Sequence, residues 1–448
     1  MARFIPVDRQ SLYLFPPSVQ DWLPEDHLAR FIVDVVDQLD LSAVEQSYAG
    51  RGSDAHHPAM LVSILLYGYA TGTFSSRALE RASYDSIAFR YITGNTHPDH
   101  DTINSFRKRF LKEIEAVFVQ VLACAQEMGM LKLGKVSLDG TKIHANASRH
   151  SAMSYGHAKK LEARLKAEVA ELMALAESAN AKDLPDGMNI PEELVRREKR
   201  LAAIAEAKAK IEARAKAEAE AAHGAKLAAR EETAKKKGRK PGGRPPTPPA
   251  GTPSDQDQVN FTDEESRIMP VPGGGFEQSY NAQAAVDTDS LLVVAQAVSQ
   301  ASNDKQQVVP MLERLQSLPE DLGRVKTLIA DTGYASEANV AACEDVKIRP
   351  MIALGREMHN QTLEQRFAEP APLPDNATAL DRMRHRLRTK RGRKVYALRK
   401  CTVEPVFGLI KHVMKFRQFS LRGLESARGE WGLVCLAWNL KRMNNLRA

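Results

Sequence analysis

The spacing of apolar residues divides this chain into a helical first part and a mixed second part. Up to about residue 130, apolar side chains recur every three or four positions, which is the period of a helix buried along one face. Four segments carry this period and are predicted helices: 26–44, 57–72, 75–94 and 99–129. Beyond residue 258 the period falls to two, which is typical of strands.

The fourth predicted helix is basic near its start. Asp101 or Thr102 is the expected N-cap, and Arg107, Lys108 and Arg109 follow within the next turns. Short helices that lead to a basic helix are typical of helix-turn-helix DNA-binding domains, so these three cations are candidate DNA contacts. An ordinary helical bundle with a solvated basic face fits the same segment equally well.

A segment rich in Ala, Glu, Lys and Arg separates the two parts. Residues 151–237 carry a narrow apolar stripe that is broken at "DLPDGMNIPEEL", where Pro191 takes a first-turn position of a new helix. We expect an antiparallel helical hairpin that projects as an arm, and a solvated spacer without a contact role is the alternative. Residues 238–258 form a basic linker rich in Pro and Gly.

Strands alternate with helices in the second part. Predicted strands lie at 135–139, 278–288, 290–300, 325–330 and 346–352, and predicted helices at 303–316, 336–345, 395–414 and 424–446. This order favours a mixed α/β or α+β domain, with a mixed sheet and flanking helices. The expected divisions are an all-helical domain at 1–130, the first strand of the sheet domain at 131–150, the arm at 151–237, the linker at 238–258, and the rest of the sheet domain at 259–448.

Composition narrows the class of protein. The 448 residues are 43% hydrophobic, which suffices for ordinary buried cores. A net charge of +7 and a pI near 9.1 are compatible with a polyanionic partner but do not require one. The four cysteines are too far apart for a zinc ribbon or a disulfide framework. We see no signal peptide and no apolar run of membrane-spanning length, and therefore expect a cytoplasmic protein.

Three acids from distant segments are candidates for one metal site. Asp139 ends the strand "KVSLD", and Asp331 ends the strand "VKTLIA". If these strands are neighbours in one sheet, their carboxylates meet and need a cation, for which Mg²⁺ or Mn²⁺ is suited. Glu404, with Lys411 two helical turns later, supplies a third acid. Taken singly, such acids are more often turn formers or helix caps.

The surroundings of Glu404 are strongly basic. Ten of the nineteen residues from 382 to 400 are Lys or Arg, and cations alternate with Phe416 and Phe419 further on. Such groups dominate binding to a phosphate backbone. Acids that hold a metal, set among cations that hold polyphosphate, indicate phosphodiester chemistry.

Other polar residues near these segments have ordinary explanations. Asn281 and Gln283 alternate along one strand face, where solvent exposure is the usual outcome. Turn or cap roles account for Asp287 and Asp304, as they do for Asp263. His144 follows the first strand and is a weaker candidate for the site.

Five blocks in order resemble a known family. "VSLDGTKIHANAS", "FTDEESRIMP", "SYNAQAAVDT", "TLIADTGYAS" and "VEPVFGLIK" are similar to the signature blocks of bacterial insertion-sequence transposases of the DDE class. The resemblance extends over nearly the whole chain. It implies a ribonuclease H-like catalytic domain, an inserted helical arm and a helical N-terminal DNA-binding domain.

The resemblance also implies roles for individual residues. Asp139, Asp331 and Glu404 would be the catalytic acids that coordinate two Mg²⁺ or Mn²⁺ ions. The tyrosine, arginine, glutamate and lysine of a family signature fall on Tyr396, Arg399, Glu404 and Lys411, although four residues separate Arg399 from Glu404 where the related signature has three. Expected partners are double-stranded DNA, as element ends and as target, and a second copy of the chain in a homodimer on DNA at the nucleoid.

Three other readings of the sequence compete with transposition. The tripeptide "DTG" at 331–333 also occurs in aspartic proteases, but only one copy is present and a basic C-terminal third has no purpose there. A metal-dependent nuclease without strand transfer would share the first chemical step. An inactive DNA-binding relic of a transposase is the third alternative.

Overall fold

Two units make up the chain, residues 1–144 together with 280–448, and residues 145–279. The computed structural model describes residues 18–46, 48, 55–178, 189–237, 246–247, 251–271, 273–355, 362, 364, 368–374 and 376–447. Across these residues, no helix has both the length and the apolar character that crossing a membrane demands.

The first unit starts with short helices. They are η1 (Val19–Trp22), α1 (Leu28–Val36), α2 (Ser42–Gln46), α3 (Pro58–Thr71), α4 (Ser76–Asp85), α5 (Ile87–Ile92), α6 (His100–Phe110) and α7 (Ile114–Glu127). Helix α3 is buried on nearly all sides, and Gly72 ends it at φ 86°, a conformation that favours glycine. The single helix predicted for 75–94 is wrong, because Ser86 takes an extended conformation that separates α4 from α5.

The helix predicted for 99–129 is also two helices. Asp99, and not Asp101 or Thr102, is the N-cap of α6, because its carboxylate accepts the Thr102 N–H at 2.8 Å. The helix ends at Phe110, so the three cations that the sequence placed near a helix start lie in the last turn instead. Positive charge is favourable at that end of a helix dipole, which gives these residues a structural explanation.

A mixed sheet forms the centre of the first unit. Five of its six strands are β1 (Lys135–His144), β5 (Phe276–Asp287), β6 (Val293–Ser299), β7 (Thr327–Ala330) and β8 (Arg349–Ile352), and the sixth, β4 (Arg267–Pro270), pairs with the first residues of β5. The order is β6-β5-β1-β7-β8, with β5 and β6 antiparallel and β1, β7 and β8 parallel. The predicted mixed sheet with flanking helices is confirmed. Strand β1 runs five residues past Asp139, where the sequence predicted its end, although its pairing with β7 stops at Leu138.

Helices and short turns connect the later strands. They are η3 (Lys305–Gln307), α10 (Val308–Gln316), η4 (Glu320–Leu322), η5 (Thr332–Tyr334), α11 (Glu337–Asp345), α13 (Ala379–Arg388), α14 (Lys390–Ala397), η6 (Leu398–Cys401), α15 (Val403–His412) and α16 (Leu424–Arg447). Pro310 is the third residue of α10, where no intrahelical hydrogen bond is lost. The helix predicted for 395–414 is interrupted at Thr402, whose backbone departs from helical geometry.

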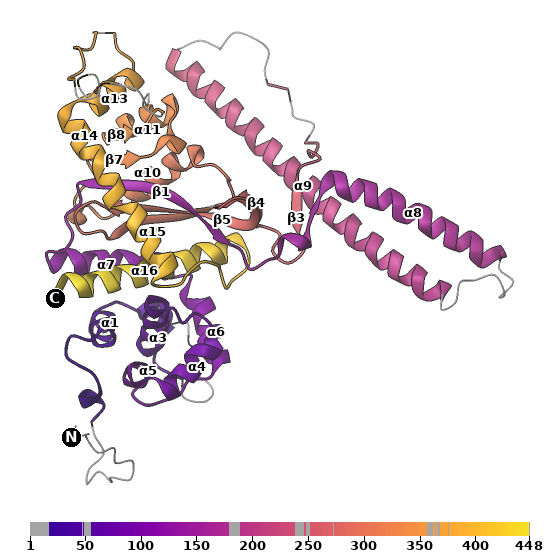
Figure 1. The fold of residues 1–448 in the computed structure, drawn as a ribbon, viewed down its shortest axis with the longest axis horizontal. Helices are drawn as coiled ribbons and strands as arrows, with labels where there is room; N and C mark the ends of the chain where they lie inside the picture. The colour runs from indigo at the N-terminus through magenta and orange to yellow at the C-terminus, as the bar shows by residue number, and fades with distance from the viewer. Residues whose placement is uncertain are drawn as a thin grey trace, which may run out of the picture. The chain divides into compact units, whose positions relative to one another are not determined.

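Helix α16 joins the N-terminal helices to the sheet. It packs on β6, on α3 and on α7, as Figure 1 shows for the neighbouring α7 and α16. A buried chain of polar groups crosses this contact: the hydroxyl of Tyr69 donates to Glu430 at 2.7 Å, and Arg107 donates to the Phe74 carbonyl at 2.9 Å. Glu430 also accepts the N–H groups of Ser420 and Leu421. The N-terminal helices therefore belong to the same unit as the sheet.

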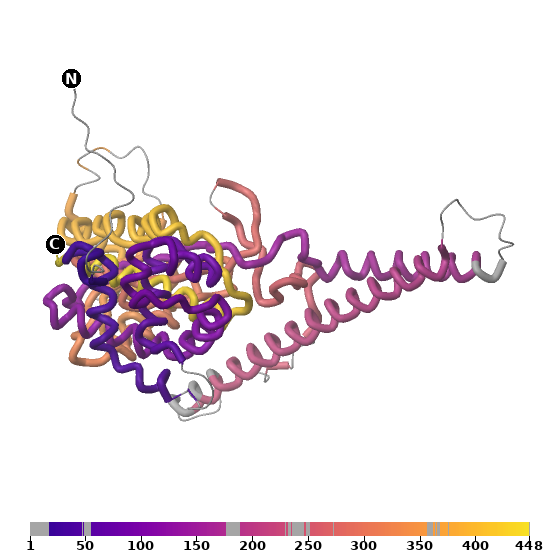
Figure 2. The backbone as a smooth tube through the Cα atoms, turned by 90° about the horizontal axis from the view of Figure 1, so that it is seen from below, coloured from indigo at the N-terminus to yellow at the C-terminus, as the bar shows by residue number. Residues whose placement is uncertain are grey.

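The second unit contains the predicted arm. Its elements are η2 (Arg149–Ser151), β2 (Ala152–Ser154), α8 (Tyr155–Ser178), α9 (Ile190–Lys237), β3 (Gln258–Asn260) and β4 (Arg267–Pro270), which pairs with the first residues of β5. Helices α8 and α9 lie side by side in Figures 1 and 2 and form the expected antiparallel hairpin. Residues 238–245 and 248–250 of the predicted linker lie outside the described residues.

A narrow apolar stripe and cross-helix ion pairs hold the hairpin together. Ala158 and Leu165 of α8 are buried against Ile204 of α9. Beside this stripe, Lys208 of α9 forms an ion pair with Glu162 of α8 at 2.6 Å. Ion pairs that remain accessible to water contribute little each, so the buried stripe is the main stabilising contact.

The arm provides a test of this packing. Ile204→Ala should destabilise the hairpin by about 2–4 kcal/mol, because it removes apolar atoms from a closed contact. Hydrogen exchange of α8 amides would measure the change, and Val195→Ala at a 49% exposed position of α9 is the control. Equal effects of the two substitutions would contradict the assignment of the stripe.

Candidate active site

Strand pairing brings the first two predicted carboxylates to one edge of the sheet. β1 and β7 are parallel neighbours, and Leu138 lies opposite Ala330 at the end of their paired stretch. Asp139 and Asp331 are the next residues of the two strands, so their positions follow from the register. Asp331 also accepts the Gly333 N–H at 2.8 Å and caps the turn η5, not the helix α11.

Glu404 joins the two aspartates through a shared arginine. Glu404 stands in the first turn of α15, and Arg399 lies in η6 just before it. Nη2 of Arg399 is 3.4 Å from Asp139 Oδ2 and 3.6 Å from Asp331 Oδ2. Nη1 of Arg399 is 2.5 Å from Glu404 Oε1. One guanidinium thus contacts all three acids predicted from the sequence.

The electrostatics of this cluster reflect burial. Burial raises the pKa of Asp139 to about 6, while Arg399 and the Gly140 N–H act in the opposite direction and Asp331 adds to the rise. For Arg399, burial by itself would lower the pKa, but the surrounding carboxylates more than offset it and the pKa is raised. The cluster therefore has an excess of negative charge that a further cation would stabilise.

The donor set suits a hard divalent cation. Carboxylate oxygens are the ligands that Mg²⁺ and Mn²⁺ prefer, and three carboxylates surround one positive group here. Among the described residues, no three Asp, Glu, His or Cys side chains stand at the spacing of a metal site. The guanidinium of Arg399 lies between the acids, so a metal ion and Arg399 would compete for the same oxygens.

Tyr396 lies near the cluster, and Lys411 contacts the strand that carries Asp139. The pKa of Tyr396 is raised, mainly by burial. Arg399 acts to lower this pKa, and the three carboxylates act to raise it. Lys411 donates from Nζ to the backbone carbonyl of Lys142 at 3.1 Å and so contacts β1.

Two families match separate parts of the chain. Residues 17–109 match the family described as "Transposase domain (DUF772)", and residues 253–440 match the "Transposase DDE domain". The chain is a DDE-class insertion-sequence transposase. Membership implies a DNA-cleaving enzyme that binds DNA. Asp331 and Glu404 fall within the second match, whereas Asp139 precedes it. Neither a curated protein nor a solved structure matches the transposase.

The predicted DNA contacts of the N-terminal helices have different environments. Arg107 is buried at 6% exposure and donates to Phe74 and Asn104, which argues against a contact between its side chain and phosphate. Lys108 is exposed, and the guanidinium of Arg109 lies 4.4 Å from the ring centre of Tyr48. Lys108 and Arg109 remain candidates.

Sequence reasoning missed a polar network behind the acids. Asn281 and Gln283 were expected to face solvent, but both are fully buried in β5. Both donate to Asp304 Oδ1, at 2.6 Å and 2.8 Å. Asp304 stands at the N-cap position of η3, as a turn or cap role predicts, but its side chain makes no cap hydrogen bond there and is engaged by the two amides instead. The available signal was the pair of amides alternating within an otherwise small and apolar strand.

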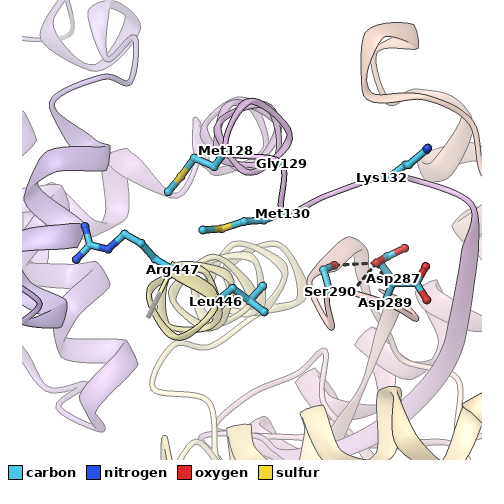
Figure 3. Close-up of a pocket in the computed structure, with 9 residues that line it drawn as sticks. All are labelled: Met128, Gly129, Met130, Lys132, Asp287, Asp289, Ser290, Leu446 and Arg447. Atoms are coloured by element: carbon cyan, nitrogen blue, oxygen red, sulfur yellow. Dashed lines mark hydrogen bonds between the residues drawn. The ribbon is translucent and has the colours of Figure 1, made fainter.

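A surface cavity of the first unit is lined by other residues. It has a volume of about 750 Å³ and is lined by Lys132, Asp287, Ser290 and Arg447 among others, as Figure 3 shows. The carboxylate of Asp287 accepts the N–H and the hydroxyl of Ser290, which confirms its expected turn role. None of the three catalytic candidates lines this cavity.

Gly140 provides a test of the close packing beside Asp139. A Cβ atom at this position would lie 2.2 Å from Gln283 Nε2 and 2.6 Å from Asp304 Oδ1. Gly140→Ala should therefore lower the free energy of unfolding by about 1–3 kcal/mol, as overpacking does. Chemical denaturation measures this, and Gly134→Ala, which meets nothing within 4 Å, should be close to neutral. A neutral Gly140→Ala would contradict the packing.

Proposed function

We propose that this transposase binds the ends of an insertion sequence and catalyses metal-dependent DNA cleavage followed by strand transfer. In this proposal Asp139, Asp331 and Glu404 are the catalytic carboxylates. The observation that carries it is their convergence on Arg399 from three segments far apart in the sequence. Scattered surface acids would have no physical reason to share one half-buried cation.

The carboxylates would hold two Mg²⁺ or Mn²⁺ ions. Bound there, the ions supply an activated water or DNA 3′-hydroxyl as nucleophile and stabilise the leaving oxygen. The chain's own part is to bind and orient the DNA. If Arg399 leaves the acids and binds a DNA phosphate, it would hold the DNA backbone. The carboxylate oxygens would then be free to bind the metal ions.

Exposed basic groups of α13 and α14 support the proposed DNA contact. Arg388, Lys390, Arg391 and Lys394 of α13 and α14 are exposed, and their side chains make no ion pair within the described residues. Unpaired cations bind a phosphate backbone without losing existing contacts. We propose that this surface, with Tyr396 and Lys411, binds the DNA that enters the site. Lys108 and Arg109 are proposed as a second contact.

Two neighbouring functions are separated by direct assays. A nuclease would cleave the element's end but would not join a pre-cleaved end to a plasmid, whereas a transposase does both. An inactive relic would bind DNA and cleave nothing. We further propose that a homodimer on DNA holds the two element ends, which the mass of the protein–DNA complex tests.

The catalytic acids can be tested singly. Asp139→Asn or Glu404→Gln should lower Mg²⁺-dependent cleavage of an element end by roughly a thousandfold or more, since charge stabilisation in the transition state is lost. DNA binding should remain largely intact in a mobility-shift assay. Glu425→Gln, at the equivalent first-turn position of α16, is the matched control. Cleavage retained in either variant would remove that residue from the site.

Competition between Arg399 and a metal ion for the carboxylate oxygens can be tested by metal binding alone, without an activity assay. Arg399→Gln should bind Mn²⁺ roughly tenfold more tightly than the wild type when DNA is absent, because the acids lose their internal cation. Electron paramagnetic resonance of free Mn²⁺ measures the affinity. Lys400→Gln, an exposed neighbour, should leave it unchanged. Equal or weaker binding by Arg399→Gln would show that the guanidinium and the ion do not share oxygens.

A further inference from the structure

A fourth carboxylate is anchored next to the three catalytic candidates. Oδ1 of Asp304 accepts hydrogen bonds from Asn281 Nδ2 and Gln283 Nε2, and Gln283 Nε2 also lies 3.1 Å from Asn281 Oδ1. The hydroxyl of Tyr334 donates to Gln283 Oε1, which fixes the orientation of that amide. Because both amides are fully buried and paired, Asp304 has little freedom to move.

The position of Asp304 is close to the two strand ends that carry aspartates. A Cβ atom on Gly140, the residue after Asp139, would lie 2.6 Å from Asp304 Oδ1. A Cβ atom on Gly333, two residues after Asp331, would lie 3.7 Å from Asp304 Oδ2. The absence of a side chain at Gly140 leaves room for this carboxylate, and Gly333 lies within ordinary contact distance of it.

Asp304 faces one half-buried lysine. Nζ of Lys142 is 3.7 Å from Asp304 Oδ1, and only 13% of the Lys142 side chain is exposed. Burial lowers the pKa of Lys142, while Asp304 and Asp139 raise it. The separation exceeds a normal hydrogen bond, and no other ion pair of Lys142 occurs within the described residues. An ammonium group with three donors is thus held near Asp139 with donors to spare.

The charges around the site explain why such a group is needed. Four carboxylates, counting Asp304, belong to the proposed site, and Arg399 already contacts three of them. Like charges repel, so an entering phosphate requires an additional cation on its path. Lys411 donates to the backbone carbonyl of Lys142 and thereby fixes the strand from which Lys142 extends.

We propose that Lys142 is a catalytic residue that contacts the scissile phosphate, and that Asp304 is its positioning residue, held by Asn281 and Gln283. This inference rests on the proposed function. Lys142 donates to a non-bridging oxygen of the phosphate, and Asp304 keeps the ammonium directed toward that oxygen. No covalent step involves either residue.

A neutral phosphate tests the contact directly. The probe is a duplex cut from the DNA that flanks this gene, with a methylphosphonate at the position where the wild-type protein cleaves. The wild type should bind this duplex roughly tenfold more weakly than normal DNA, the scale of one lost charge-assisted contact. Lys142→Gln should bind normal DNA roughly tenfold more weakly and should not distinguish the two duplexes. Lys142→Arg should restore most of the discrimination.

Controls separate this contact from a purely structural role. Lys326→Gln removes a positive charge before the start of β7, at the strand end opposite Asp331, and should discriminate as the wild type does. Asp304→Asn should lose discrimination while Lys142 is intact. Near-ultraviolet circular dichroism shows whether the Asp304→Asn variant is folded. If this variant does not fold, the Lys142 variants alone test the phosphate contact.

The outcomes distinguish this inference from the proposed function. Discrimination by Lys142→Gln equal to that of the wild type would overturn the phosphate contact. Full discrimination by a folded Asp304→Asn would overturn the positioning role. Failure of the wild type to bind or cleave DNA would instead overturn the proposed function, because the methylphosphonate comparison requires only binding once the cleavage position is known.

Discussion

The parallel pairing of β1 with β7 is the constraint on which the site depends. Leu138 opposite Ala330 fixes where both strands reach the edge of the sheet, and the following aspartates inherit that position. A shift of one residue would turn every side chain of one strand to the opposite face. Apolar burial specifies the register, since Val136 and Leu138 are fully buried. Burial of apolar residues in the core therefore fixes the positions of the two aspartates, although the aspartates themselves lie outside the core.

Around this pairing, charge is only partly compensated within the protein. Arg399 contacts three carboxylates, and Lys142 faces a fourth, Asp304. The buried amides of β5 hold Asp304, and Trp431 of α16 donates to the Gln283 carbonyl at 3.0 Å, so the same strand is held from a second element. Removal of one partner would leave a buried polar group unpaired, which costs more than the contact itself contributes. Because every partner in the network is needed, the network is rigid, and the loss of any one partner would destabilise it.

Helix α16 connects the domains that the sequence separates. Asn439 exchanges two hydrogen bonds of 2.8 Å with the backbone of Val293 in β6. On the same helix, Glu430 accepts from Tyr69 of α3. A helix buried on several sides has no amphipathic stripe, and this explains why the chain pattern does not reveal its partners. The predicted helical domain at 1–130 accordingly packs as part of the first unit rather than as a separate one.

The sequence by itself determined five of the strands apart from their exact ends, the arm and the three catalytic candidates, because period and local polarity depend on neighbours along the chain; the short strands β2, β3 and β4 lie in runs too short to show a period. Apolar runs that end in an acid identified Asp139 and Asp331, and the basic context identified Glu404. Only the tertiary structure decided that Asn281 and Gln283 are buried, that Arg107 is internal, and that Asp304 faces Lys142. Such contacts join residues far apart in the chain, and a polar side chain gives the same local pattern whether water or another buried polar group satisfies it.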